Sequence, residues 1–271
     1  MKLSVALWTY VSLIEKGMSV PDILRHMHKN GVQYVELLDI FLKTDEEKKQ
    51  AKQVIDELGM KVASYSVTNN FVSDESTRLQ QVEMLKNACQ IAHFFETDTI
   101  RVFCGDLKEG YDFEKAFDLI VKSFKECVPV AEKENICFCL ENHGKLAGKS
   151  KQIEAVIRAV NSKHLKITAD TGNFLLVGEN PLQAIQYLKN DIGLIHFKDF
   201  LLVDKDHVQY YGLDGIYTRG VILTKGDVPL KEIIQFLKQE NYQGCISIES
   251  EGLTTLENIE ECIANTTALM K

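Results

Sequence analysis

The sequence has no long hydrophobic run. No apolar run in its 271 residues approaches the roughly 20 residues needed to cross a bilayer. A signal peptide is not expected either, because a strand is predicted to begin at Leu3. The seven cysteines are an odd number and form no CxxC pair. Since this usage is typical of reduced core cysteines, we expect a cytoplasmic protein.

Linkers and basic clusters are scarce as well. Only 4 prolines occur, and no stretch rich in Gly, Ser and Pro interrupts the chain, so we expect one domain over residues 1–271. The formal net charge is −8, and Lys and Arg are not clustered. An acidic chain without a basic patch is not expected to bind nucleic acid or an anionic membrane. The length suits an α/β barrel of about 250 residues.

Strand and helix patterns alternate eight times along the chain. The predicted strands begin near residues 3, 33, 61, 99, 136, 165, 192 and 245, and each is followed by an amphipathic helix. Pro129 is expected to kink or end the fourth helix. Eight strand–helix pairs predict a single (β/α)8 TIM barrel. The alternative, a doubly wound open sheet, lacks its Gly-rich phosphate loop after the first strand.

Polar residues end four successive predicted strands. The apolar runs ICFCLENHG, LKITADTGN, IGLIHFKD and CISIESEG deliver Glu141, Asp170, His196 and Glu249. The first two steps are 29 and 26 residues long, and a strand, a helix and two short loops need about 25–35 residues. Because the carboxyl ends of barrel strands meet at one rim, we expect these four side chains to lie together.

Three carboxylates cannot converge in a low-dielectric pocket without a counter-charge. A divalent cation would supply it, and carboxylate oxygens with one imidazole suit Mn²⁺ best, with Mg²⁺, Co²⁺ or Zn²⁺ left open. Such a metal could chelate adjacent oxygens of a polyol or keto-sugar and stabilise an enediolate. A carboxylate on each side of the substrate could take and return protons.

The third step, from His196 to Glu249, is 53 residues long and is the irregular one. It leaves residues 200–228 between the seventh strand and its helix, with three tyrosines, Arg219 and Lys225. Long ordered loops in compact domains are often lids or binding loops. Two interpretations remain open here, a lid that closes over a polar substrate and a solvated surface excursion.

Four short motifs also carry a family resemblance. LENHG at 140–144, ADTGN at 169–173, HFKD at 196–199 and SIESEG at 247–252 resemble the xylose isomerase-like barrels of the sugar phosphate isomerase/epimerase group. The resemblance covers essentially the whole chain, and the motifs follow in the expected order. It implies one divalent metal, a small carbohydrate substrate and a (β/α)8 barrel.

The resemblance also implies roles for individual residues. The metal ligands would be Glu141, Asp170, His196 and Glu249, with Glu141 and Glu249 doubling as the acid/base pair. The substrate contacts would be His143, Asn173, Lys198, Arg219 and Trp8. For Trp8, the only tryptophan, plain core packing is an equal alternative. For Lys198, the alternative is an ion pair with its neighbour Asp199.

The chain departs from many relatives at one of these positions, where Asn173 replaces a histidine. An amide can hydrogen-bond a hydroxyl but cannot act as an acid at neutral pH, so the departure bears on substrate choice. The abasic-DNA endonucleases of the same superfamily have extra histidine ligands. The third and fourth strands here end in residues 64–67 and 104–105, without a histidine.

Three functions remain open from the sequence. The first is a metal-dependent isomerase or epimerase of a sugar or keto-polyol. The second is a dehydratase of the inosose or dehydroshikimate type, which makes the same enolate and then expels a β-hydroxyl. The third is a non-catalytic sugar-binding barrel. The substrate, its phosphorylation and the formation of a homo-oligomer are left open.

Overall fold

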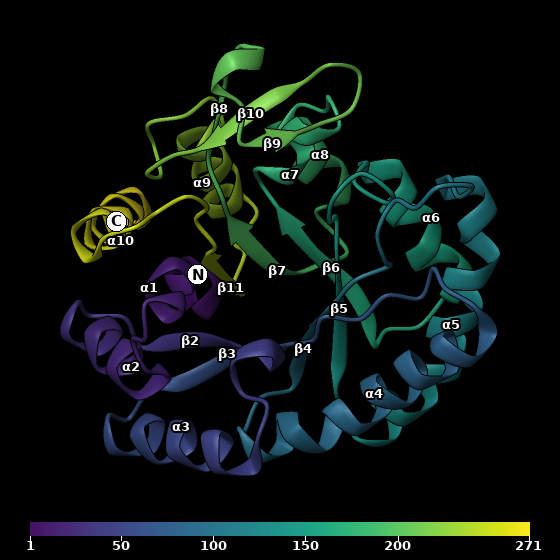
Figure 1. The fold of residues 1–271 in the computed structure, drawn as a ribbon, viewed down its shortest axis with the longest axis horizontal. Coiled ribbons are helices and arrows are strands. Elements are labelled where there is room, and N and C mark those ends of the chain that lie inside the picture. Colours follow the sequence, from purple (N-terminus) through teal and green to yellow (C-terminus); the bar gives the residue numbers. More distant parts are fainter.

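Eight parallel strands form a closed barrel in the computed structural model, which describes all 271 residues (Figure 1). The order around the barrel is β1-β11-β7-β6-β5-β4-β3-β2. The barrel strands are β1 (Lys2–Ala6), β2 (Tyr34–Leu38), β3 (Lys61–Ser66), β4 (Thr99–Val102), β5 (Cys137–Glu141), β6 (Leu165–Asp170), β7 (Ile192–Phe197) and β11 (Cys245–Ile248). The predicted (β/α)8 barrel is confirmed.

Helices surround the strands and bury their apolar faces on them (Figure 1). The main helices are α2 (Val20–Lys29), α3 (Asp45–Glu57), α4 (Glu75–Phe94), α5 (Phe113–Lys133), α6 (Ser150–Val160), α8 (Pro181–Leu188), α9 (Leu230–Gln239) and α10 (Leu256–Met270). The shorter ones are η1 (Leu7–Tyr10), α1 (Val11–Glu15), η2 (Asp39–Phe41), α7 (Asn173–Leu176) and η3 (Lys205–His207). None of these helices has the length and apolarity of a membrane span.

Helix α3 shows how the local sequence sets these elements. The Thr44 hydroxyl accepts the Glu47 N–H, and the Glu47 carboxylate accepts the Thr44 N–H. This capping box satisfies two of the free donors at the start of the helix. Ala51, Val54 and Ile55 then recur at helical spacing and are buried. Their apolar stripe fixes which face of α3 packs inward.

The expectation that Pro129 would end the fourth helix is wrong. Helix α5 does not end at Pro129 but continues to Lys133. The ring of Pro129 is on the exposed face, while Cys127, Val128 and Ala131 are buried and hold the last turn against the barrel. Strand β1 stops at Ala6, and the 3-10 helix η1 follows it directly.

A small antiparallel sheet accounts for most of the long 200–228 segment. Its strands are β8 (Phe200–Leu202), β9 (Tyr210–Tyr211) and β10 (Tyr217–Gly220), in the order β8-β10-β9. Figure 1 shows this sheet in green at the upper edge of the molecule, outside the barrel strands. We call it the flap sheet. Its position at the end of β7 explains the irregular step between the third and fourth rim residues.

The buried carboxylate of Asp199 anchors the segment behind the flap sheet. It accepts the backbone N–H groups of Thr224, Gly226 and Val228 at 2.9–3.1 Å. A Cβ at position 226 would collide with this carboxylate, so a side chain there is excluded. Asp199 does not pair with Lys198, and the proposed ion pair between these neighbours is therefore wrong.

Candidate metal centre

Four side chains from four neighbouring strands meet at the carboxyl-terminal rim. Glu141 ends β5, Asp170 ends β6, His196 lies in β7, and Glu249 directly follows β11. The parallel pairing places Asp170 opposite His196. One ligand atom of each residue lies within 4.8 Å of the others, and all four residues are buried. The expectation that the four would lie together is confirmed.

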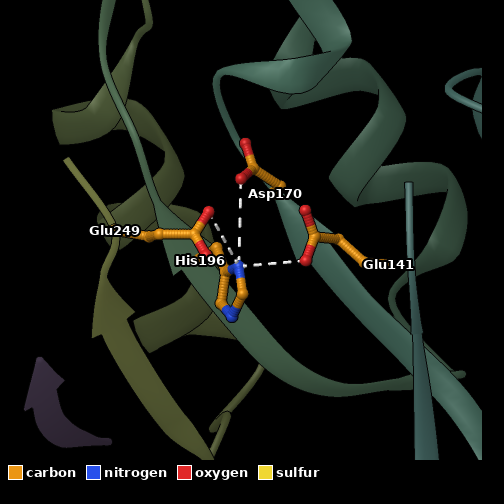
Figure 2. A group of neighbouring side chains, drawn as sticks. All are labelled: Glu141, Asp170, His196 and Glu249. Carbon is orange, nitrogen blue, oxygen red and sulfur yellow. Dashed lines mark ion pairs between the residues drawn. The ribbon is translucent and has the colours of Figure 1, made fainter. Parts of the chain in front are cut away.

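The imidazole Nδ1 of His196 is at the centre of this group. It lies 3.4 Å from Glu141 Oε2, 3.9 Å from Asp170 Oδ2 and 3.4 Å from Glu249 Oε2. Figure 2 shows the three carboxylates around this nitrogen, with Glu141 and Glu249 on opposite sides. Nδ1, Glu141 Oε2 and Asp170 Oδ2 are buried without a hydrogen-bond partner. A buried polar atom without a hydrogen bond costs about 1–3 kcal/mol, and ion pairs with Lys198 and Arg101 offset part of this cost for Asp170 Oδ2 and Glu141 Oε2. Because all three atoms face one point, a cation could bind there.

Glu36 on β2 orients the histidine. Both of its oxygens lie 3.0 Å from His196 Nε2, and the Ser66 hydroxyl donates to Oε1 at 2.5 Å. Because a carboxylate only accepts, the proton of a neutral imidazole would be on Nε2, which leaves the Nδ1 lone pair free for a metal. Glu36 was missed in the sequence analysis. The signal was visible, since a single carboxylate interrupts the apolar run YVELL.

The pKa values of the rim carboxylates are shifted in opposite directions. Burial is the main cause that raises the pKa of Asp170, to about 7, against the opposing effect of Lys198. Burial and Glu249 also oppose ionisation of Glu141, but His196, a hydrogen bond from His143 and Arg101 together hold its pKa down at about 2.

The imidazole of His196 responds to the same environment. Burial favours its neutral form, but the carboxylates of Glu36, Glu249 and Glu141 outweigh burial and raise the pKa of His196 well above its usual value. A divalent cation at the same place would take over the role of that proton.

Arg101 on β4 places a positive charge at the rim, and the sequence analysis did not predict it. Its Nε is buried, lacks a hydrogen-bond partner and lies 3.3 Å from Glu141 Oε2. The guanidinium also lies over the ring of Phe103, 4.0 Å from its centroid. Arg101 thus balances part of the negative charge on the β4–β5 side of the rim.

Two of the predicted substrate contacts, His143 and Asn173, also contact Glu141. The Asn173 side chain donates to Glu141 Oε1 at 3.0 Å, and its backbone N–H donates to Asp170 Oδ1 at 2.8 Å. His143 Nδ1 lies 3.1 Å from the same Oε1, and its ring stacks on Phe103 with 4.0 Å between centroids. The side-chain and backbone amides of Asn173 therefore hold the carboxylates of two candidate ligands in place.

Lys198 lies on the opposite side of the group. Its buried Nζ is 2.7 Å from Glu249 Oε2, 3.0 Å from Asp170 Oδ2 and 3.5 Å from Glu251 Oε1. These contacts place a permanent cation directly beside two of the four candidate ligands. Glu251, two residues beyond Glu249, was not singled out in the sequence.

The remaining predicted contacts are at the edge of the site. Trp8 in η1 stacks on Phe41, with 6.3 Å between ring centroids, and its Nε1 donates to Glu251 Oε1 at 3.0 Å. Trp8 is thus half-buried at the rim and not plain core. Arg219 lies on β10, and its guanidinium makes no hydrogen bond or ion pair with any of the rim residues.

The charges of the whole rim favour a divalent cation. Two permanent cations, Lys198 and Arg101, and one imidazole face a larger number of carboxylates. Those carboxylates are Glu36, Glu141, Asp170, Glu249 and Glu251. Carboxylate oxygens with one imidazole are a donor set for Mn²⁺, Mg²⁺, Co²⁺ or Zn²⁺. The residues present therefore fit a metal.

Together, the closed barrel and the carboxylate–imidazole rim define an α/β barrel with a candidate metal site at the carboxyl ends of its strands. The chain belongs to the xylose isomerase-like TIM barrel family, whose model matches residues 24–267. The resemblance inferred from the four motifs is confirmed.

Two curated relatives illustrate the range of the family. An uncharacterised protein of Methanocaldococcus jannaschii is 26% identical over 198 residues, which are 70% of this chain but only 64% of the relative's length. A 3-dehydroshikimate dehydratase of Bacillus anthracis is 23% identical over 242 residues, which are 86% of each chain.

Solved structures share the fold over the full chain. The IolI protein with a bound zinc atom has a TM-score of 0.82 at 16% identity, covering 100% of this chain and 98% of the other. D-psicose 3-epimerase with D-tagatose, from Clostridium cellulolyticum H10, has a TM-score of 0.78 at 14% identity, covering 100% of both chains. At these identities the likeness establishes the fold.

Proposed function

We propose that the protein is a divalent-metal-dependent isomerase or epimerase of a sugar or keto-polyol and acts through an enediolate. The observation that carries this proposal is the placement of two carboxylates, Glu141 and Glu249, on opposite sides of His196 (Figure 2). A carbon bound between them has a proton acceptor on one face and a proton donor on the other. Inversion by deprotonation and reprotonation needs that arrangement.

The four rim residues, Glu141, Asp170, His196 and Glu249, would hold the metal. When bound, the metal would polarise the substrate carbonyl and stabilise the negative charge that develops on its oxygen. We propose Mn²⁺, with Mg²⁺, Co²⁺ and Zn²⁺ as alternatives. Glu36 keeps Nδ1 of His196 turned toward the other ligands.

The protein groups would divide the proton chemistry as follows. Glu249 and Glu141 would each take or return a substrate proton, and both carboxylates would also help to hold the metal. Glu141 Oε1 is in contact with His143, and the side chain of His143 is 38% exposed. His143 therefore offers a path by which a proton on Glu141 exchanges with solvent.

Substrate oxygens would be bound by the surrounding polar groups. Lys198 is held beside Glu249 and Asp170 and would donate to a developing oxyanion. Trp8 provides an apolar wall for the carbon skeleton. We retain Arg219 on the flap sheet as a substrate contact in the closed complex, and Asn173 as a support of Glu141 that also faces the substrate.

Dehydration is a second candidate, favoured by the relative that matches 86% of each chain and is a 3-dehydroshikimate dehydratase. Both reactions begin when a carboxylate removes a proton beside a carbonyl. They differ in the next step, because a dehydratase expels a β-hydroxyl with a proton, whereas an epimerase returns a proton to carbon. His143 beside Glu141 could protonate such a leaving hydroxyl.

Incubation with candidate keto-sugars and keto-polyols in D₂O separates these reactions. Deuterium at the substrate carbon without loss of water supports the isomerase or epimerase. Loss of water supports the dehydratase. Binding of a sugar without exchange or water loss, with metal present, contradicts both and indicates a non-catalytic sugar-binding barrel.

A further inference from the structure

Glu251 is the one partner of Lys198 that lies outside the proposed ligand set. Lys198 is buried, and its ammonium is shared by Glu249, Asp170 and Glu251. Asp170 and Glu249 are candidate metal ligands. A bound dication would compete with the ammonium for their charge and would also repel it. Glu251 would not bind the metal, so its negative charge would still attract the Lys198 ammonium fully.

The same carboxylate holds two other parts of the molecule. Oε1 of Glu251 accepts the indole N–H of Trp8 at 3.0 Å, and Oε2 accepts the phenol of Tyr210 at 2.8 Å. Trp8 follows β1, whereas Tyr210 is on β9 of the flap sheet. Glu251 therefore joins the barrel, the flap sheet and the cation beside the metal centre.

The backbone of residue 251 also lies directly against the flap sheet. A Cβ on Gly220, at the end of β10, would collide with the carbonyl oxygen of Glu251. The end of β10 thus packs against Glu251 so closely that a side chain at position 220 has no room. A change in the orientation of the Glu251 side chain would therefore alter its contacts with both Tyr210 and β10.

We propose that Glu251 is a positioning residue that couples metal binding to the order of the flap sheet. This inference rests on the metal site of the proposed function. As a metal takes up the charge of Asp170 and Glu249, the ion pair between Lys198 and Glu251 strengthens. A firmly held Glu251 in turn holds Tyr210 and Trp8 more firmly. The flap sheet would then close over the substrate when the metal is in place.

A purely structural role gives a different result. If Glu251 only attached the flap sheet to the barrel, it would do so equally with and without metal. The two roles are therefore distinguished by how much metal slows hydrogen exchange in the flap sheet, and not by the stability of the flap sheet without metal.

The test uses Zn²⁺ as the probe, because it has no redox chemistry. Amide hydrogen exchange over residues 200–220 and Trp8 emission are measured with and without Zn²⁺ on the whole protein. In the wild type, Zn²⁺ is expected to slow this exchange by roughly 5-fold or more, the low end of typical coupling between sites. It is also expected to change the emission of Trp8, the only tryptophan.

Two variants and two matched controls complete the test. In Glu251→Gln and Tyr210→Phe, Zn²⁺ should still raise the melting temperature but should no longer slow exchange over residues 200–220. Glu240→Gln removes a carboxylate paired with Lys189 on the outer surface. Tyr211→Phe removes the hydroxyl of the exposed neighbour. Both controls should keep the wild-type response to Zn²⁺.

The outcomes are distinct. If Zn²⁺ raises the melting temperature but leaves wild-type exchange unchanged, or if both variants respond as the wild type does, the coupling is overturned and the proposed metal site stands. If Zn²⁺ fails to raise the wild-type melting temperature, the metal site itself is overturned. Should Glu251→Gln not fold, Tyr210→Phe decides, since it deletes only one hydroxyl.

Discussion

Two clusters of charged side chains differ in how completely their buried polar atoms are hydrogen-bonded. Between α4 and α5, the guanidinium of Arg78 is fully buried, and all three of its nitrogens have partners. Nε and Nη2 donate to Glu75, both at 2.9 Å or less, and Nη1 donates to Ser123 and Glu126 at 3.1 and 2.9 Å. At the rim, by contrast, Arg101 Nε and one atom each of Glu141, Asp170 and His196 are buried without a hydrogen-bond partner.

The contrast separates a structural role from a functional one. A buried charge normally has its hydrogen bonds satisfied, because an unsatisfied one lowers the stability of the fold. Arg78 follows this rule on the outer side of the barrel. The rim departs from it at four atoms, and such a departure is expected where a ligand completes the coordination.

The largest expected effect concerns the use of the rim carboxylate of Glu249 for proton transfer. Glu249→Gln keeps the size and one coordinating oxygen but cannot accept a proton as a carboxylate does. Metal and substrate should still bind, while turnover falls by about 10²–10⁴-fold, the usual contribution of a general base. Solvent deuterium exchange at the substrate carbon should fall in parallel. Near wild-type exchange would assign the proton to another group, such as His143 or Lys198.

A smaller effect, on metal affinity, is expected from changing Glu36, whose carboxylate contacts Nε2 of His196. Glu36→Gln retains a hydrogen-bond acceptor for Nε2 but removes the negative charge. Metal affinity should fall by about 10–100-fold, the usual result of changing the partner of a ligating histidine. Competition with a chelator measures this affinity, and Ser66→Ala is a control that deletes one hydrogen bond to Glu36. Unchanged affinity in Glu36→Gln would show that Glu36 only fills space in the barrel.

A substitution in the fully hydrogen-bonded Arg78 cluster should lower the stability of the fold without changing metal binding. Arg78→Met keeps much of the buried volume and removes the charge-assisted hydrogen bonds. We expect the free energy of unfolding to fall by about 1.5–3 kcal/mol, with metal content and turnover unchanged. Denaturant unfolding measures the first quantity. Loss of metal from a folded Arg78→Met protein would contradict the purely structural role assigned to the Arg78 cluster.

The smallest effect concerns the pH dependence of stability. Hydrogen bonds from Arg78 and then Lys122 lower the pKa of Glu75 from 4.5 to about 2. Since the folded pKa is the lower one, this carboxylate stabilises the fold above pH 4.5, and the contribution is lost as the pH falls toward 2. The difference in stability between the wild type and Arg78→Met should therefore narrow over this interval. A constant difference would contradict the assignment.

The barrel and four of the rim residues could be predicted because their signals are local. Each apolar run ends at a polar residue within one strand, and the carboxyl ends of parallel strands share a rim. Glu36 could not be placed in the same way. It meets His196 from a position 160 residues earlier in the sequence, and that contact requires the barrel to close. Arg101 and Glu251 likewise gain their roles from partners on other strands.

Two further predictions depended on information that local patterns do not contain. Pro129 was expected to kink or end α5, but the helix does not end there, because the packing of the last turn against the barrel keeps it to Lys133. Arg219 on β10 stays a predicted substrate contact, since its guanidinium makes no hydrogen bond or ion pair with the rim residues. Whether it reaches the site depends on movement of the flap sheet, which no sequence pattern encodes.

The measurement that tests the account most directly is metal analysis of the gently purified protein. The account predicts about one equivalent of a divalent metal, as a single mononuclear site requires. The metal should be lost in Asp170→Asn and His196→Ala and kept in Arg78→Met. A folded wild-type protein that contains no metal, and whose melting temperature does not respond to added Mn²⁺, Mg²⁺, Co²⁺ or Zn²⁺, would contradict it.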